Sequence, residues 1–154
     1  MSISLGIENA LAFDVERLST LNTVDLLPKI TQSVVIHGFN FTEALEKALK
    51  ENFKLGRHTN VFHFTPDCVT KYLWAHKDYQ PWGHKLPLQC LQCGIFKPWV
   101  SCFLKDSQGY GLECRNVECG RLKGKERESF QAPKPDAPFL TMGKNAGWLK
   151  LTIN

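Results

Sequence analysis

Residues 90–120 read CLQCGIFKPWVSCFLKDSQGYGLECRNVECG, and the cysteine spacing in this stretch decides how the middle of the chain folds. Two residues separate Cys90 from Cys93, four separate Cys114 from Cys119, and twenty lie between the two pairs. Each pair is followed by a glycine, which suits a turn with positive φ. A short cysteine turn can present two thiolates to one tetrahedral zinc ion while its N–H groups point at the sulfurs. The spacing therefore predicts one structural Zn²⁺ bound by these four cysteines.

The segment between the cysteine pairs has the composition needed to bring them together. Residues 95–106 and 110–114 are rich in strand formers, and Ser107, Gln108 and Gly109 between them suit a hairpin turn. The order of turn, strand, hairpin, strand and turn resembles the zinc-ribbon group, and the resemblance covers about residues 86–122. The four-residue spacing of the second pair departs from that group's pattern and leaves room for a different local geometry.

The expected compartment supports metal binding over disulfides. The first thirteen residues, MSISLGIENALAF, lack the basic flank and cleavage site of a secretory signal, and the sequence has no apolar run of about 18 residues. We therefore expect a cytoplasmic or nuclear protein without a membrane span, where closely spaced cysteines more often hold metal.

Two other interpretations of the cysteines stay open. A redox Cys-x-x-Cys pair usually opens a helix, whereas Cys90 and Cys93 precede a hairpin. Four unrelated buried thiols would leave the paired, glycine-terminated spacing unexplained. Cys68 and Cys102 are expected to be buried free thiols, although either is an alternative ligand.

The sequence predicts an α+β fold with a helical N-terminal part, residues 1–84, that contains a short strand near Ala10 to Asp14. Apolar spacing indicates helices over residues 25–39 and from the N-cap Thr42 to Gly56. The alternation in residues 60–65 predicts a strand, and residues 66–77 are interpreted as a short helix.

The rest of the chain is divided into a zinc ribbon, residues 85–122, and a basic loop with a C-terminal strand, residues 123–154, that packs on the body. Three prolines make residues 131–147 an expected irregular surface segment. The alternating GWLKLTIN, residues 147–154, predicts the closing strand.

Positive charge is concentrated in and after the cysteine region. The net charge is −1 over residues 1–84, +3 over 85–128 and +2 over 129–154. Basic and aromatic side chains there can meet phosphates, bases or an acidic protein surface. The candidate contact residues are Lys97, Trp99, Lys105, Arg115, Arg121, Lys123, Lys125 and Arg127. We expect a protein partner ahead of nucleic acid, because a basic face is also an ordinary way of staying soluble.

No catalytic residue is assigned. The sequence contains no G-x-S-x-G, glycine-rich phosphate loop or H-E-x-x-H motif. A Cys68 nucleophile with His63 or His76, or a histidine-bound metal near the ribbon, is the enzymatic alternative, and nothing in the spacing requires either. Four thiolates also leave zinc no open position for a substrate. The expected function is a non-catalytic zinc-binding interaction module.

A second resemblance covers most of residues 50–154. At LGRHTNVFHF, PWGHKLPLQCLQCG and GWLKLTIN the chain resembles the C-terminal region of large uncharacterised fungal proteins with an upstream caspase-like or related α/β domain. The resemblance implies that residues 1–55 are the last strand and helices of such a domain, and that the chain is a remnant or accessory part of a larger hydrolase. No position matches a caspase-type histidine and cysteine dyad, so it implies no protease activity here.

Overall fold

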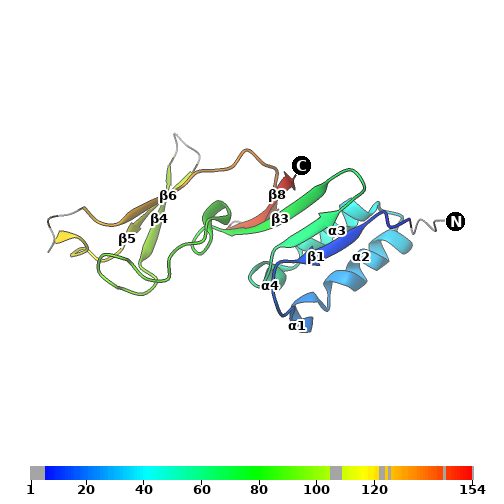
Figure 1. The fold of residues 1–154 in the computed structure, drawn as a ribbon, viewed down its shortest axis with the longest axis horizontal. Coiled ribbons are helices and arrows are strands. Elements are labelled where there is room, and N and C mark those ends of the chain that lie inside the picture. The colour runs from blue at the N-terminus through cyan, green and yellow to red at the C-terminus, as the bar shows by residue number, and fades with distance from the viewer. Residues whose placement is uncertain (1–5, 105–108, 122–123, 125, 144, 154) are drawn as a thin grey trace. The chain divides into compact units, whose positions relative to one another are not determined.

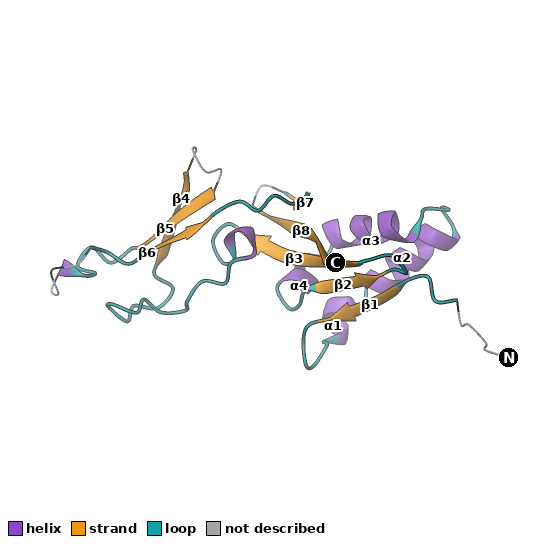
Figure 2. Cartoon of the chain, turned by 45° about the horizontal axis from the view of Figure 1, so that its top comes forward, coloured by secondary structure: helices purple, strands orange, loops and turns teal. Residues whose placement is uncertain are grey.

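Short runs of alternating apolar residues build a five-stranded sheet in the order β1-β2-β3-β8-β7 (Figure 2). The strands are β1 (Ala10–Phe13), β2 (Val61–Phe64), β3 (Val69–His76), β7 (Phe139–Met142) and β8 (Ala146–Ile153). β1 pairs with β2, β2 with β3 and β7 with β8, all antiparallel. The computed structural model describes residues 6–104, 109–121, 124, 126–143 and 145–153, without the side chains of Cys102 and Phe103.

Four helices precede β2 along the chain: α1 (Thr20–Thr23), α2 (Leu26–Val35), α3 (Phe41–Lys50) and α4 (Phe53–Gly56). α2 and α3 pack on each other, and α3 also contacts β7 and β8 on one face of the sheet (Figure 1). The N-cap of α3 is Asn40 instead of the predicted Thr42, because the Asn40 side chain accepts a hydrogen bond from the Glu43 N–H at 2.9 Å. The predicted continuous helix ending at Gly56 is interrupted after Lys50.

The core lies between these helices and the sheet. Its fully buried side chains include Leu45 and Leu49 of α3, Tyr72 of β3 and Trp148 of β8. The Trp148 indole N–H donates to the Leu49 carbonyl at 2.9 Å, which satisfies the polar atom of a fully buried ring. Glu46 accepts from Tyr72 Oη at 3.2 Å and from Lys150 Nζ at 2.8 Å, so polar bonds also join α3 to the sheet.

The α+β prediction is confirmed, but two further local predictions are wrong. Residues 69–76 form β3 instead of a short helix, because Thr70, Tyr72 and Trp74 alternate into the core while Pro66 falls in the turn after β2. The segment predicted to be irregular contains β7 and the end of β6 (Ser129–Ala132), since its prolines fall between these strands and not within them.

The chain divides into two compact units, residues 1–74 with 137–154, and residues 75–136. The second unit contains the 3-10 turn η1 (Pro81–Gly83) and an antiparallel sheet of β4 (Trp99–Leu104), β5 (Gly109–Cys114) and β6. The two strands predicted between the cysteine pairs are present, and β6 adds a third. Of the predicted turn, Ser107 and Gln108 lie outside the described residues.

No helix in the described ranges combines the length and the apolar character needed to cross a bilayer.

We expect the substitution Gly56→Ala to destabilise the first unit. A Cβ at Gly56 would lie 2.2 Å from Cε3 of Trp74, and Trp74 is buried and packs edge-on against Trp148. Overpacking of this kind costs about 1–3 kcal/mol. Urea denaturation followed by tryptophan fluorescence measures the loss. The matched control is Gly6→Ala, where nothing lies within 4 Å of the added Cβ, and equal free energies of unfolding for the two variants would contradict the packing described.

Candidate metal centre

The first cysteine turn is a tight loop closed by backbone hydrogen bonds. The Gly94 N–H donates to the Cys90 carbonyl at 2.8 Å, and the Cys90 N–H donates to the Ile95 carbonyl at 3.1 Å. Gly94 has φ +70°, a conformation that costs glycine least. The predicted role of the glycine after the pair is therefore confirmed, and it turns the chain directly after Cys93.

The second cysteine turn follows β5, whose last residue is Cys114. The Cys119 N–H donates to the Asn116 carbonyl at 3.0 Å, and Gly120 has φ +79°. The wider spacing of this pair makes a longer loop that still ends in a left-handed glycine. Both pairs thus end in the same backbone conformation despite their different lengths.

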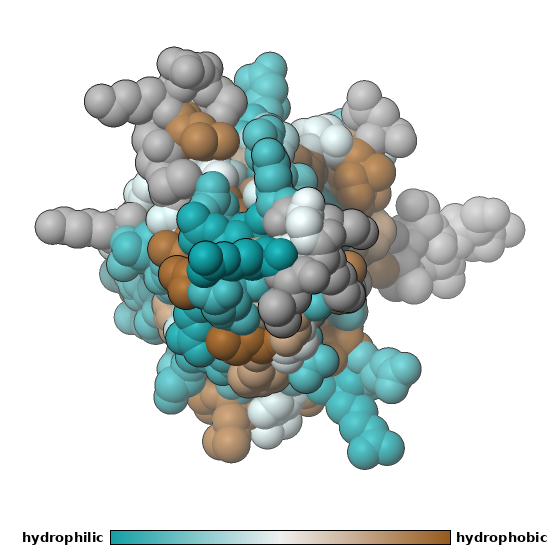
Figure 3. Space-filling view, turned by 90° about the vertical axis from the view of Figure 1, so that its left-hand side faces the viewer, coloured by the Kyte–Doolittle hydropathy of each residue, from teal (hydrophilic) through white to brown (hydrophobic). Residues whose placement is uncertain are grey.

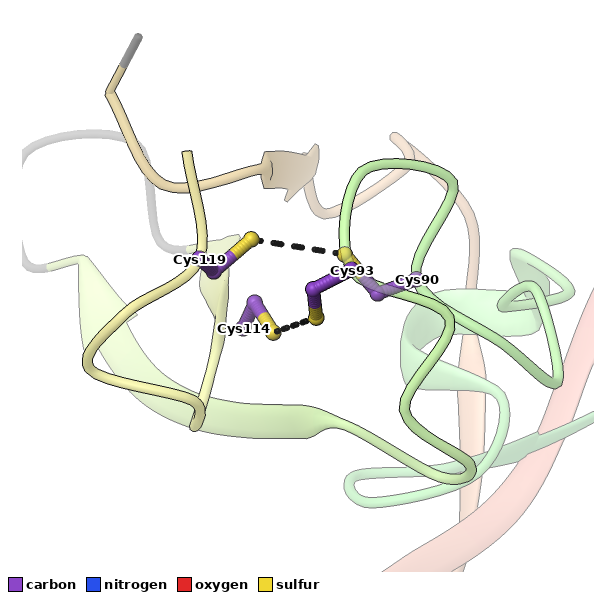
Figure 4. A group of neighbouring side chains, drawn as sticks. All are labelled: Cys90, Cys93, Cys114 and Cys119. Carbon is purple, nitrogen blue, oxygen red and sulfur yellow. Dashed lines mark hydrogen bonds between the residues drawn. The ribbon is translucent and has the colours of Figure 1, made fainter. Parts of the chain in front are cut away.

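The β4–β5 hairpin brings the two turns together. Its register pairs Trp99 with Cys114, so the chain entering β4 and the chain leaving β5 lie side by side. Cys90 Sγ lies 3.5 Å from Cys119 Sγ, and Cys93 Sγ lies 3.6 Å from Cys114 Sγ. All four sulfurs lie within 4.8 Å of one another and point into one space between the turns (Figure 4).

These distances fit one tetrahedral ion. Zinc–sulfur bonds of about 2.3 Å place tetrahedral sulfurs about 3.8 Å apart. A disulfide needs about 2.05 Å, and the four cysteines are free thiols. Cys90, Cys114 and Cys119 are buried, and with Cys93 and Ile95 they make up the small apolar cluster of the ribbon. The four cysteines can therefore hold a metal ion, as the spacing predicts.

The local environment shifts the pKa values of Cys90, Cys93 and Cys114 in different directions. Burial raises the pKa of Cys90 and of Cys114, so both favour the protonated form without a cation. A hydrogen bond from the Ile95 N–H, aided by the Asn116 side chain, lowers the pKa of Cys93 to about 6. A metal ion that binds all four thiolates must displace protons from the buried pair, so its apparent affinity falls as the pH falls.

Glu128 contacts the first cysteine turn, and the sequence analysis did not anticipate this contact. Its Oε2 accepts from the Leu91 N–H at 2.7 Å and the Gln92 N–H at 3.3 Å, and from the Cys90 thiol at 2.8 Å. The Glu128 carbonyl also accepts from the Cys114 N–H at 2.9 Å. This residue, directly before β6, therefore contacts both cysteine turns. Its position in a charged segment, RLKGKERE, gave no signal of this role.

The structure brings two of the candidate contact residues together and separates others. Lys97 and Trp99 line one groove. Arg121 pairs with Glu118 at 3.0 Å, and Arg127 lies 3.8 Å from Glu113, both at the surface. Arg115 is exposed at the start of the second turn. Lys105, Lys123 and Lys125 lie outside the described residues.

The side chains considered for cysteine catalysis are engaged elsewhere. His63 is buried, and its Nε2 lies 2.9 Å from Asn9 Oδ1. Cys68 Sγ lies 3.6 Å from Thr65 Oγ1 in the turn between β2 and β3. Within the described residues no hydrogen bond joins Cys68 to His63, and the side chain of Cys102 is outside the description.

No protein-family model matches the chain, and no significant match was found among curated proteins or solved structures. These comparisons give no support to the resemblance to large fungal proteins. The geometry of the four cysteines therefore carries the functional argument alone.

We predict that Glu128→Ala weakens zinc binding, because it frees the Leu91 and Gln92 N–H groups that hold the first cysteine turn in shape. Beyond the effect of burial, the same carboxylate raises the pKa of the Cys90 thiol that it contacts, which opposes metal binding, so the measured loss is the net of the two effects. Loss of such a supporting contact typically costs about 10–100-fold in metal affinity. Competition with a chromogenic chelator measures the change. Glu128→Gln keeps an acceptor for both N–H groups and should retain most of the affinity, and the exposed Glu126→Ala is the control. Equal affinities for Glu128→Ala and Glu126→Ala would show that the contact has no such role.

Proposed function

We propose that residues 75–136 form a non-catalytic zinc-ribbon module that binds one structural Zn²⁺ and mediates contact with a protein partner. The observation that carries the proposal is the convergence of four thiols within 4.8 Å. Cys90, Cys93, Cys114 and Cys119 would be the ligands. Four sulfur donors at tetrahedral spacing favour zinc over the oxygen-preferring cations.

A structural role follows from the donor set and from the small core of the ribbon. Four thiolates fill the coordination sphere and leave no position for water or substrate, as catalytic zinc requires. Among the side chains that the structure describes, Ile95 alone joins the cysteines in the apolar cluster around the sulfurs. A bound zinc ion would add to the burial of Leu112 and Ala132 as a source of stability, since structural zinc supplies on the order of 10 kcal/mol in small fingers.

Apolar side chains exposed on the same unit support a role in binding. Within residues 88–117 five large apolar residues are more than half exposed: Leu88, Leu91, Phe96, Val100 and Val117. Hydrophobic areas also interrupt the hydrophilic surface in the view of Figure 3. Single exposed apolar residues are normal, but several on one small module favour a surface that is covered by a partner.

Nucleic-acid binding is the alternative, since the unit carries basic and aromatic side chains. Two of the proposed contacts, Arg121 and Arg127, face glutamates, and this reduces the positive charge they offer to a phosphate. A remnant or accessory part of a larger cysteine- or metal-dependent hydrolase is the other alternative. The reduced thiols fit a cytoplasmic or nuclear protein, which is the location we propose.

Elemental analysis of the purified full chain tests the zinc proposal. We expect close to one zinc ion per chain in the parent and little in Cys114→Ser, because three thiolates leave the tetrahedral site incomplete. Cys68→Ser is the matched control and should keep its zinc, since Cys68 lies in the turn between β2 and β3. A folded parent free of metal would contradict the proposal, as would equal zinc loss in the two variants.

A further inference from the structure

A groove on the second unit is built from three short segments that are separated in the sequence. Asp78 and Tyr79 precede η1, Leu86 to Leu88 precede the first cysteine turn, and Lys97 and Trp99 lie at the entrance to β4. The groove has a volume of about 250 Å³. This volume is below the range of about 300–1,000 Å³ that is usual for cofactor and drug-sized ligand pockets. It suits one or two inserted side chains better than a whole small molecule.

Hydrogen bonds hold the walls of the groove in place. The Trp99 indole N–H donates to the Pro87 carbonyl at 2.7 Å, and the Lys97 N–H donates to the Leu88 carbonyl at 2.8 Å. Lys97 itself has φ +47°, a strained conformation for a residue with a Cβ. Since the polar atom of Trp99 is already satisfied, this side chain offers an occupant its apolar ring.

Apolar groups of the groove are open to solvent. Leu88 is 67% exposed and Tyr79 is 60% exposed, and Tyr79 stacks on His76 at a centroid distance of 4.7 Å. Aromatic residues in such positions are typical anchors of protein interfaces. These two side chains and Trp99 form a surface that gains free energy when an apolar side chain covers it.

The charges at the groove distinguish between classes of partner. Lys97 and Asp78 are both exposed, and within the described residues neither forms an ion pair. A nucleic-acid strand needs several cations along its phosphates, whereas the Asp78 carboxylate would repel one. The rings of Tyr79 and Trp99 are flat enough for a base as well as for an apolar side chain, so the charges are what distinguish the two classes of partner. One cation and one anion beside an apolar floor match a peptide, which carries both charges and apolar side chains.

We propose that this groove binds an extended segment of a protein partner that inserts an apolar side chain against Tyr79, Leu88 and Trp99 and places a carboxylate near Lys97. The inference rests on the proposed zinc ribbon, because Leu88 and Lys97 flank the first cysteine turn. It adds the position of the binding surface and the chemistry of the partner segment. The zinc ion has no direct contact with the segment and only holds the groove in shape.

Selection of peptides tests this inference. The zinc-loaded full chain is presented to a phage library of random twelve-residue peptides, and enriched peptides are then synthesised with a fluorescent label for affinity measurement. We expect enriched sequences with a large apolar residue within a few positions of Asp or Glu. Leu88→Glu should weaken them at least about ten-fold, as the loss of an interface anchor does. Leu91→Glu is the matched control, since Leu91 is 83% exposed and is not part of the groove.

The variant Lys97→Glu distinguishes a specific charge contact from nonspecific hydrophobic binding. This variant should lose the acidic peptides and, in its own selection, enrich peptides with Lys or Arg beside the apolar residue. No enrichment on the parent, or enriched peptides that bind Leu88→Glu as well as the parent, would overturn the proposal. A labelled twelve-residue dT oligonucleotide that binds the parent and is lost in Lys97→Glu, with no peptide enriched, would overturn it in favour of nucleic acid.

The zinc content of every variant is measured before selection, so the two proposals fail differently. A parent without zinc refutes the ribbon and the groove together. A parent with one zinc ion per chain and no selected peptide refutes the groove alone. A variant that has lost its zinc is replaced by Leu88→Gln, which removes the apolar group without adding charge, and the same ten-fold loss is then required.

Discussion

Four thiols from two turns that are twenty residues apart in the sequence converge on one space, and this convergence constrains the fold of the second unit. Two unit charges 4 Å apart interact with about 1 kcal/mol in water and about 4 kcal/mol near a protein surface. Four thiolates within 4.8 Å would therefore repel one another strongly without a cation between them. The β4–β5 hairpin imposes this proximity through its register, in which Trp99 lies opposite Cys114. A divalent metal ion between the sulfurs would turn this repulsion into attraction.

The two units are stabilised by different means. The first has a conventional core of leucines and aromatic rings between two helices and a sheet, with Trp148 and Tyr72 fully buried. In the second, the described residues bury a small cluster of cysteines with Ile95, together with Leu112 and Ala132 of the sheet. In the sequence this second unit follows β3 and precedes β7 of the first unit.

The sequence predicted those features that depend on local spacing. The two cysteine turns, the hairpin strands and the C-terminal strand follow from ligand spacing and from period-two alternation, which a single segment displays by itself. β3 was missed because Pro66 and Asp67 read as a helix start, and only its pairing with β2 shows that they form a turn. β6 was missed because the pairing with β5 that makes it a strand is absent from its own sequence.

Contacts between distant segments also limited what could be predicted of the metal centre and of the groove. The four converging cysteines could be named from the sequence, while Glu128 could not, because its contact with the first turn spans more than thirty residues and follows no motif. Lys97 and Trp99 were candidate contact residues only because one is basic and the other aromatic. Tyr79 and Leu88 become relevant only once the fold places them beside those two residues in one groove.

X-ray absorption at the zinc edge of the purified protein tests the central claim most directly, because it reports the atoms bound to the metal without any variant. A single shell of four sulfur neighbours at about 2.3 Å is the result that the account predicts. A shell with nitrogen or oxygen at about 2.0–2.1 Å in place of one or more sulfurs would contradict it, since the ligand set of Cys90, Cys93, Cys114 and Cys119 would then be wrong.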